Sequence, residues 1–552
     1  MNSKANITLF LLALLGTVTA CRLPHQAILP ASGAVQLRLD SIHWQYGDLI
    51  EDSLPGISLH KAFSKKQELH LISHPVLVAV LDSELDIHHP ELKDRIWTNE
   101  AEIPSNQIDD DHNGYIDDVH GWNFWGNADG ETSTYYTPYE YVRIFKKLDP
   151  IFKHKERHQI SSDSLHLYNQ YTQSRDLYEA EYAYQKNTYP EYIKNLEKSY
   201  VTQRDTIQKL FPQMKFDLEH LKSLQSDDAF IQKKLKNLIY YLESDIEEVL
   251  VDYKNTNENH FTYYLNLNYN DRLAIGDEVD NFEDRKYGHP IIFNDSLSPK
   301  HATKVSGIIA NMSQYMSNDQ IQIMPLVTIV NGDPHDKDMA LAIRYAVDNG
   351  ASVINMSFGK QMSIHNEWVM DAIKYAEEKD VLIVKSAGND GKDITDIKDF
   401  PNDVNDENME VFTNFITVGS TQKNIKEGLI SKFSNYSSTQ VDLFAPGEGI
   451  LVSIPHNAYK IDSGTSLSAP IVTGIAALIK SYYPHLTAPQ IKEILMASGT
   501  VIDREVEIMD ANGQPQLVPF ASLSKSGKIV NAYNALRLAQ QYKKWKKGKT
   551  WE

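Results

Sequence analysis

The chain is almost without cysteine, because Cys21 is the only one among its 552 residues. A single thiol excludes an intramolecular disulfide, so a stable fold has to depend on an apolar core. Hydrophobic residues make up 41% of the chain, an ordinary proportion for a globular protein. The composition therefore predicts a folded protein and excludes wholesale disorder.

Long apolar runs are also scarce. The run 471–479 is too short to cross a bilayer and predicts a buried helix. At the N-terminus, Lys4 precedes the apolar run 7–18, and small residues follow up to Cys21, a pattern typical of a secretory signal peptide. Because the pattern ends on cysteine, residues 1–20 resemble a bacterial lipoprotein signal. The resemblance implies export to the bacterial cell envelope and a membrane anchor on a lipidated Cys21, in a leaflet that the sequence does not specify. An ordinary signal peptide with an incidental cysteine is the alternative.

Positive charge is the minority sign, and the formal net charge is −20. An acidic surface repels a phosphate backbone, so we expect no nucleic-acid partner. The exception is the basic tail at residues 541–552, which is rich in lysine. We expect this tail to be solvated, with contact to anionic lipid as the alternative.

Short continuous apolar runs predict strands that are buried on both faces. They occur at 76–81, 321–327, 352–356, 381–385 and 415–418. Between them, residues 337–349 and 365–379 carry apolar side chains at helical spacing. Strands that alternate with helices predict an α/β fold, a doubly wound and mostly parallel sheet. We assign this domain to residues 71–131 and 264–540, and we interpret residues 21–70 as an N-terminal segment or linker.

Glycine is missing from residues 132–263, which are polar and rich in tyrosine and lysine. The segments 210–224 and 230–251 have apolar residues at helical spacing. We therefore predict a large helical insertion, arranged as a long antiparallel hairpin. The insertion carries no motif that predicts chemistry. It could be a structural arm, or an arm that guides substrate, forms a dimer or inhibits the domain. The sequence does not predict the oligomeric state.

One serine stands at the predicted start of an apolar helix. Ser466 lies in Gly464-Thr465-Ser466, just before a helix dense in small residues. Free backbone N–H groups and the helix dipole would stabilise negative charge at its oxygen, but serine needs a positioned base to act as a nucleophile. A simple helix cap is the alternative for this segment alone.

Candidates for the base and its orienting acid lie elsewhere in the chain. His301 opens an apolar helical segment, and Asp82 ends the predicted strand 76–81. Polar side chains at the carboxyl ends of parallel strands gather at one edge of the sheet. An acid there would fix the tautomer of the imidazole. Asn389, which follows the strand 381–385, would supply an amide donor for a developing oxyanion.

The order of these residues, Asp82, His301 and then Ser466, is the order found in subtilisin. Asp82-Ser83, His301-x-Thr303, Ala387-Gly388-Asn389 and Gly464-Thr465-Ser466-x-Ser468-Ala469-Pro470 resemble the signature blocks of the subtilase serine proteases.

The resemblance to the subtilases implies a serine endopeptidase with a triad of Asp82, His301 and Ser466, with Asn389 in the oxyanion hole. It also implies protein or peptide substrates that bind as an added strand. The substrate-binding residues would be Ser357, Phe358, Gly359 and Gly388.

The chain departs from the family pattern at Glu84, Ala302 and Lys304, where the family usually has glycine, glycine and histidine. None of these changes removes a catalytic group. They nevertheless leave open a catalytically impaired homologue that binds extended peptides, and an envelope structural protein is a further alternative.

A cluster of acidic residues suggests a metal site. Asp109, Asp111, Asn113 and Asp117 place oxygen ligands at spacings that resemble the first part of a calcium loop, with Gly114 between them. His120 stands where such a loop has its bidentate glutamate. We expect no required cofactor, and calcium as an optional structural ion; an ordinary polar turn is the alternative.

Overall fold

The computed structural model describes residues 43–127, 130, 135–294, 300–405, 407–425, 428–510 and 513–548. These residues form two compact units. The sheet unit comprises the described residues up to Glu140 and from Asn270 onward, and the helical unit spans Tyr141–Tyr269. The helical unit overlaps the insertion predicted at 132–263, but it starts and ends later. Cys21 and the predicted signal peptide lie outside the described residues.

The sheet unit is built on parallel strands. Within the described residues, nine strands form one sheet in the order β10-β13-β7-β6-β5-β4-β1-β3-β2. Their bounds are β1 Val76–Asp82, β2 Trp122–Asn123, β3 Ile321–Val327, β4 Val353–Met356, β5 Leu382–Ser386, β6 Phe415–Thr421, β7 Leu443–Pro446, β10 Thr500–Val501 and β13 Lys528–Ile529. Only the edge pair β10 and β13 runs antiparallel among these. Two further hairpins, β8 Ile450–Ile454 with β9 Ala458–Asp462 and β11 Glu505–Met509 with β12 Pro515–Pro519, stand outside this sheet.

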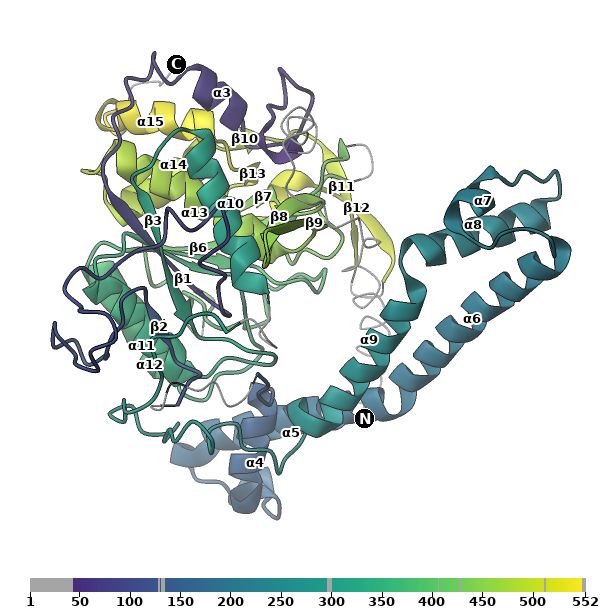
Figure 1. Ribbon diagram of the computed structural model, residues 1–552. Helices are drawn as coiled ribbons and strands as arrows, with labels where there is room; N and C mark the ends of the chain where they lie inside the picture. Colours follow the sequence, from purple (N-terminus) through teal and green to yellow (C-terminus); the bar gives the residue numbers. More distant parts are fainter. Residues whose placement is uncertain are drawn as a thin grey trace. The chain divides into compact units, whose positions relative to one another are not determined.

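Helices cover both faces of the sheet (Figure 1). Their bounds are α3 Leu59–Ser64, α10 His301–Tyr315, α11 Asp336–Asp348, α12 Asn366–Glu378, α13 Thr465–Tyr482, α14 Ala488–Ser498 and α15 Ala532–Trp545. Side chains of β1 alternate between two cores, because Val78 and Val80 pack with α10 and α13 while Ala79 and Leu81 pack with α11 and α12. This confirms the predicted doubly wound α/β fold.

The first and last segments of the described residues pack into the domain, which the sequence did not predict. Trp44, Ile57 and Leu59 are buried in the core that also holds Leu536 of α15. The described part of the segment 21–70 is therefore part of the domain and not a linker, because its scattered apolar residues find partners far away in sequence. The basic tail also begins inside a helix, since α15 runs to Trp545.

The helical unit consists of α4 Glu140–Phe152, α5 Leu165–Ala183, α6 Tyr189–Leu210, α7 Leu218–Ser223, α8 Ala229–Glu243 and α9 Ile246–Asn259, with π-helical turns at Tyr184–Thr188 and His260–Tyr264. The helix α6 packs against both α8 and α9 (Figure 1). The helices expected at 210–224 and 230–251 are each interrupted. Phe211, which precedes Pro212, leaves the helical conformation, and Asp245 has a positive φ of 48°.

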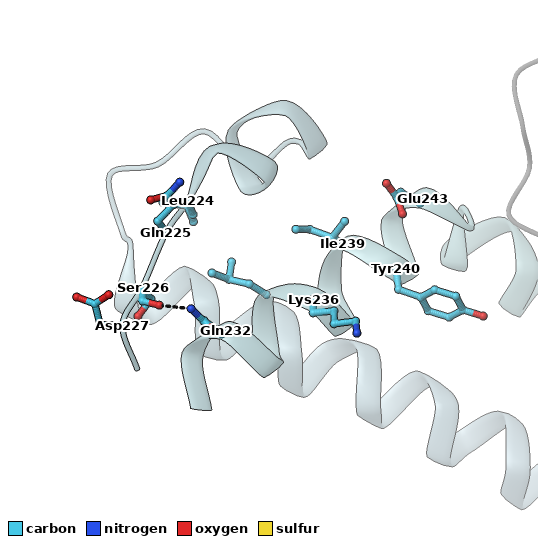
Figure 2. A pocket seen from close by; sticks show the side chains of 10 residues that line it. Leu224, Gln225, Ser226, Asp227, Gln232, Lys236, Ile239, Tyr240 and Glu243 are labelled. Carbon is cyan, nitrogen blue, oxygen red and sulfur yellow. Dashed lines mark hydrogen bonds between the residues drawn. The ribbon is translucent and has the colours of Figure 1, made fainter. Parts of the chain in front are cut away.

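A groove of about 530 Å³ lies in the helical unit between residues 224–227 and one face of α8. Figure 2 shows the side chains that line it, with Gln232 hydrogen-bonded to Ser226. The lining residues are Leu224, Gln225, Ser226, Asp227, Gln232, Leu235, Lys236, Ile239, Tyr240 and Glu243. None of them was predicted as a site residue. In the part of the chain that the structure describes, we find no helix with the length and apolar character needed to span a membrane.

Candidate active site

Three predicted site residues lie at the carboxyl ends of adjacent strands. Asp82 is the last residue of β1, Ser357 directly follows β4, and Asn389 comes shortly after β5. The strands β5, β4 and β1 are neighbours and run parallel, so their carboxyl ends share one edge of the sheet. This is the edge at which ligands bind in open α/β sheets.

Asp82 and His301 form a direct pair. The Nδ1 atom of His301 lies 2.9 and 2.8 Å from the two carboxylate oxygens of Asp82. Because an ionised carboxylate only accepts hydrogen bonds, Nδ1 donates and Nε2 is left as the acceptor of the ring. The Asp82 side chain is fully buried, whereas 26% of the His301 side chain is exposed. The acid is therefore held inside the domain while the ring reaches its surface.

The loop after β1 fixes the start of α10, where His301 is the first residue. The backbone N–H of Ala302 donates to the Ser83 hydroxyl over 3.1 Å, and the backbone N–H of Asp86 donates to the Thr303 hydroxyl over 3.1 Å. Ala302 lies in regular helix, so glycine is not required there. Glu84 is buried and accepts a hydrogen bond from the backbone N–H of Asn294.

Ser466 and Asn389 lie close together around Gly464. The Ser466 Oγ is 3.0 Å, and the Asn389 Nδ2 is 3.7 Å, from the point where a Cβ on Gly464 would stand. The Asn389 Oδ1 accepts hydrogen bonds from the backbone N–H and the hydroxyl of Thr465, each over 2.9 Å. These bonds fix the amide so that its NH₂ group is available as a donor. Ser357 contacts the backbone of Ser466, because its hydroxyl donates a hydrogen bond to the Ser466 carbonyl over 2.9 Å.

Among the described residues, no hydrogen bond joins the His301 ring to the Ser466 hydroxyl. Catalytic hydrogen bonds are often long in proteins without substrate and tighten in the complex. The structure thus contains two pairs, Asp82 with His301 and Ser466 with Asn389.

Lys304 belongs to a cluster of ion pairs that joins α10, which begins with His301, to β9, which precedes Ser466 in the chain. Its Nζ lies 2.7 Å from Asp462 of β9, and the Nζ of Lys460 lies 2.9 Å from the same carboxylate. Burial alone would raise the pKa of Asp462, but these ammonium groups outweigh burial and lower the pKa to about 2. Lys304 therefore replaces the usual histidine with a charged tether between α10 and β9.

Replacing Asp462 with asparagine is expected to lower the free energy of unfolding at pH 7 by about 2 kcal/mol. A carboxyl with a depressed pKa stabilises the fold above its unfolded pKa of 3.8, and this contribution is lost as the pH falls toward 2. Urea unfolding of both proteins between pH 7 and pH 3 measures the effect. A difference that does not shrink below pH 4 contradicts this account of the tether.

The predicted calcium residues are only partly brought together. Carboxylate oxygens of Asp109, Asp111 and Glu102 all lie within 4.8 Å of one another. The Asp117 carboxylate lies elsewhere and accepts hydrogen bonds from the backbone of residues 106 and 107. The side-chain oxygen of Asn113 accepts from the N–H of Tyr115. A cluster of carboxylates is the kind of ligand set that suits a hard cation such as calcium. Glu102 belongs to this cluster, and Asp117 does not. The sequence had no signal for Glu102, because it precedes the loop.

The predicted substrate-binding residues follow the two central strands. Ser357, Phe358 and Gly359 continue directly from β4, and Gly388 lies in the loop after β5. Gly388 has a positive φ of 96°, and a Cβ there would lie 2.6 Å from the Asn435 amide. Asn435 is a positioning residue that the sequence did not reveal.

Asn435 holds the loop that carries Asn389. Its Nδ2 donates to the Ala387 carbonyl over 3.0 Å, and its Oδ1 accepts from the backbone N–H groups of Asp390 and Lys392, each over 3.1 Å. The amide thus bonds to the backbone on both sides of Asn389. Several bonds from one rigid side chain keep the loop in one conformation.

Comparison with known proteins places the chain in a family. The sequence pattern that defines the subtilase family matches residues 73–505, which is more than half of the chain. The chain therefore belongs to the subtilase family. An intracellular serine protease of Paenibacillus polymyxa is 31% identical over 259 residues, which are 44% of this chain and 74% of that protein.

A thermophilic serine proteinase of Bacillus sp. strain AK1 is 37% identical over 151 residues, covering 27% of this chain and 33% of that protein. The chain thus spans about a third of this relative's length. Among solved structures, the prenylagaramide maturation protease PagA is 24% identical with a TM-score of 0.34, covering 44% of this chain and 82% of that one. The matched sequence relatives are named as serine proteases, and the family is one of serine peptidases.

Proposed function

We propose that the chain is a serine endopeptidase that cleaves peptide bonds through an acyl-enzyme on Ser466. The observation that carries the proposal is the Asp82–His301 pair, at the sheet edge where Asn389 also lies. Membership of the subtilase family supports the same reaction. The proposed substrates are proteins or peptides that lie in extended form along residues 357–359.

In the proposed reaction, the Ser466 oxygen attacks the carbonyl carbon while the Nε2 of His301 takes the hydroxyl proton. The buried Asp82 stabilises the imidazolium that forms. The Asn389 amide and the backbone N–H of Ser466 donate to the oxyanion. The proton then passes from His301 to the leaving amine, and water releases the acyl group by the same route in reverse.

Labelling with a fluorophosphonate tests this proposal. The folded protein is expected to form one covalent adduct, which peptide mapping by mass spectrometry places on Ser466. Folded protein that is not labelled but binds extended peptides contradicts catalysis and supports an impaired homologue. Absence of both labelling and peptide binding, together with self-association that requires residues 141–269, supports a structural role.

We also propose that the protein is exported and anchored through a lipid on Cys21. The support is the sequence pattern up to that residue, which resembles a lipoprotein signal. Cells expressing the full chain and fed a labelled fatty acid are expected to label the protein, and Cys21→Ser is expected to remove the label. Equal labelling of both proteins contradicts the anchor.

We propose that a calcium ion binds between the carboxylates of Glu102, Asp109 and Asp111. An ion that binds only the folded state raises the midpoint of thermal unfolding, and the rise grows with the logarithm of the ion concentration relative to its Kd. We expect millimolar calcium to raise this midpoint by several degrees, and Glu102→Gln to reduce the rise. Asp117→Asn is the matched control and is expected to leave the calcium-dependent rise intact. An equal rise in the Glu102→Gln protein contradicts this ligand set.

A further inference from the structure

A buried lysine directly follows the segment along which the proposed substrates lie. Lys360 comes after Gly359, and its side chain is fully buried. Its backbone exchanges N–H···O hydrogen bonds of 2.9 and 2.8 Å with the backbone of Phe400. A charge in the interior needs partners, because a buried charge that loses its partner strongly destabilises the fold. The partners of Lys360 therefore show what holds this end of the segment.

The ammonium group of Lys360 bonds to two segments that lie far from it in sequence. Its Nζ donates to the Pro334 carbonyl over 2.8 Å and lies 2.8 Å from the Asp336 carboxylate. It also lies 3.5 Å from the Oε1 of Glu140. Both acidic side chains are buried. Burial alone would raise the pKa of Asp336, but Lys360 and the hydrogen bonds to this carboxylate outweigh burial and lower the pKa.

The same two carboxylates hold the turn after Lys360. Asp336 accepts hydrogen bonds from the Ser363 hydroxyl over 2.8 Å and from the backbone N–H groups of residues 364 and 365 over 3.0 and 2.9 Å. Glu140 accepts from the N–H of residue 364 over 3.2 Å. Because several charge-assisted hydrogen bonds converge on this turn, they hold it in one conformation. The segment 357–359 is thus anchored at its C-terminal end.

Glu140 stands where the chain enters the helical unit. It is the first residue of α4 and the last residue of the sheet unit before the helical unit begins. Its backbone N–H donates to the Asp333 carboxylate over 2.8 Å. The Thr137 hydroxyl donates over 2.8 Å to Asp271, which lies just after the chain returns to the sheet unit. The entry and the return are thus joined to each other within the sheet unit.

The segment 333–338, at the start of α11, contacts the entry, the return and Lys360. Besides the bonds of Asp333, Pro334 and Asp336 given above, the Nε2 of His335 lies 2.8 Å from Asp271, and Asp338 pairs with Arg272. Asp336 and Asp338 lie in the first turn of α11, where the helix dipole stabilises negative charge. One helix start therefore fixes both connections to the helical unit and the turn that follows the substrate segment.

We infer that Glu140 and Lys360 are positioning residues that hold the substrate-binding segment 357–359 to the point where the chain enters the helical unit. The inference rests on the proposed peptidase function and adds how its substrate segment is fixed before substrate binds. A peptide that adds a strand along this segment binds more tightly when the segment is already ordered, because ordering it on binding costs affinity. Neither residue contacts the reacting atoms, so their effect falls on KM and not on kcat.

Two substrates of different length test the inference. One carries a single residue before the cleaved bond and the other carries several, so only the long substrate lies along residues 357–359. Glu140→Gln keeps the shape of the side chain and removes its charge. It is expected to raise KM for the long substrate about tenfold, the value of one charge-assisted hydrogen bond. The kcat values, the KM for the short substrate and the rate of fluorophosphonate labelling are expected to stay within about twofold of wild type, because the reacting groups are unchanged.

Asp149→Asn is the matched control, because it also removes one carboxylate charge from α4. Asp149 accepts a hydrogen bond from the Tyr171 hydroxyl over 3.0 Å, inside the helical unit. This variant is expected to leave KM unchanged for both substrates. Ser363→Ala is a milder second variant, which removes one hydrogen bond to Asp336 and keeps the inference testable if Glu140→Gln does not fold. It is expected to raise KM for the long substrate about threefold.

The outcomes separate this inference from the proposed function. A loss of the same factor on both substrates, or no change in either variant, overturns the inference and leaves the peptidase intact, since the wild-type protein still cleaves. If the wild-type protein is neither labelled nor active, the proposed function fails. Calorimetry with the long peptide, on protein with and without Glu140→Gln, then decides the positioning role. Binding that is about tenfold weaker in the variant supports it, and equal or absent binding in both proteins overturns it.

Discussion

Replacing Ser466 with alanine is expected to lower kcat for peptide hydrolysis by about a million-fold, which is the order of loss when a triad loses its nucleophile. The remaining groups still bind substrate and stabilise the oxyanion. A residual rate about a thousandfold above that of uncatalysed hydrolysis in water is therefore expected. The measurement is release of a fluorescent leaving group, with purity high enough to exclude a contaminating protease.

Ser468→Ala is the matched control, because it also removes one serine hydroxyl from the same helix. The Ser468 hydroxyl is buried and donates to the carbonyls of residues 445 and 446. Its loss is expected to cost about 1 kcal/mol of stability and to preserve fluorophosphonate labelling. A Ser466→Ala protein that retains wild-type turnover contradicts the acyl-enzyme mechanism.

Replacing Asp82 with asparagine is expected to lower kcat by about ten-thousandfold. The asparagine amide can donate to Nδ1, which then holds the proton on Nε2, so the ring loses its ability to act as a base toward Ser466. The distances of 2.8 and 2.9 Å leave no room for water between the groups. Stopped assays with the same fluorogenic peptide measure the loss, and circular dichroism checks the fold.

Asp86→Asn is the control for this second variant. Asp86 is also buried, and within the described residues its carboxylate accepts hydrogen bonds from the backbone N–H groups of His88 and His456. We expect the replacement to cost stability and to change kcat far less than Asp82→Asn does. Equal losses in kcat for the two variants would mean that the effect of Asp82 is structural and not electrostatic.

The strands of the central sheet were predictable because they are buried on both faces. A run such as Val76–Leu81 has no polar alternation, which is typical of a parallel strand between two helical layers. The helices α11 and α12 were also predicted to within a residue or so, since each has a single apolar face. The interruptions at Phe211 and Asp245 were missed because the apolar periodicity continues across each break.

The candidate site could be predicted in part from the sequence, because its residues lie in short blocks with characteristic neighbours. Asp82, His301, Asn389 and Ser466 each lie at the end of a strand or the start of a helix, and the order of the blocks is informative. The residues that position these side chains could not be predicted from the sequence. Asn435 and Asp462 belong to segments without a motif, and nothing in the chain shows which loop they bond to.

The sequence by itself determined the class of fold, the family and the residues that would carry the reaction, because these depend on local patterns of burial and on blocks of neighbouring residues. Only the tertiary structure decided the partners. It paired Lys304 with Asp462, placed Glu102 beside Asp109, and set Lys360 beside Glu140. The reason is physical: such contacts join side chains far apart in the chain, and their energies depend on distance and burial that exist only once the chain is folded.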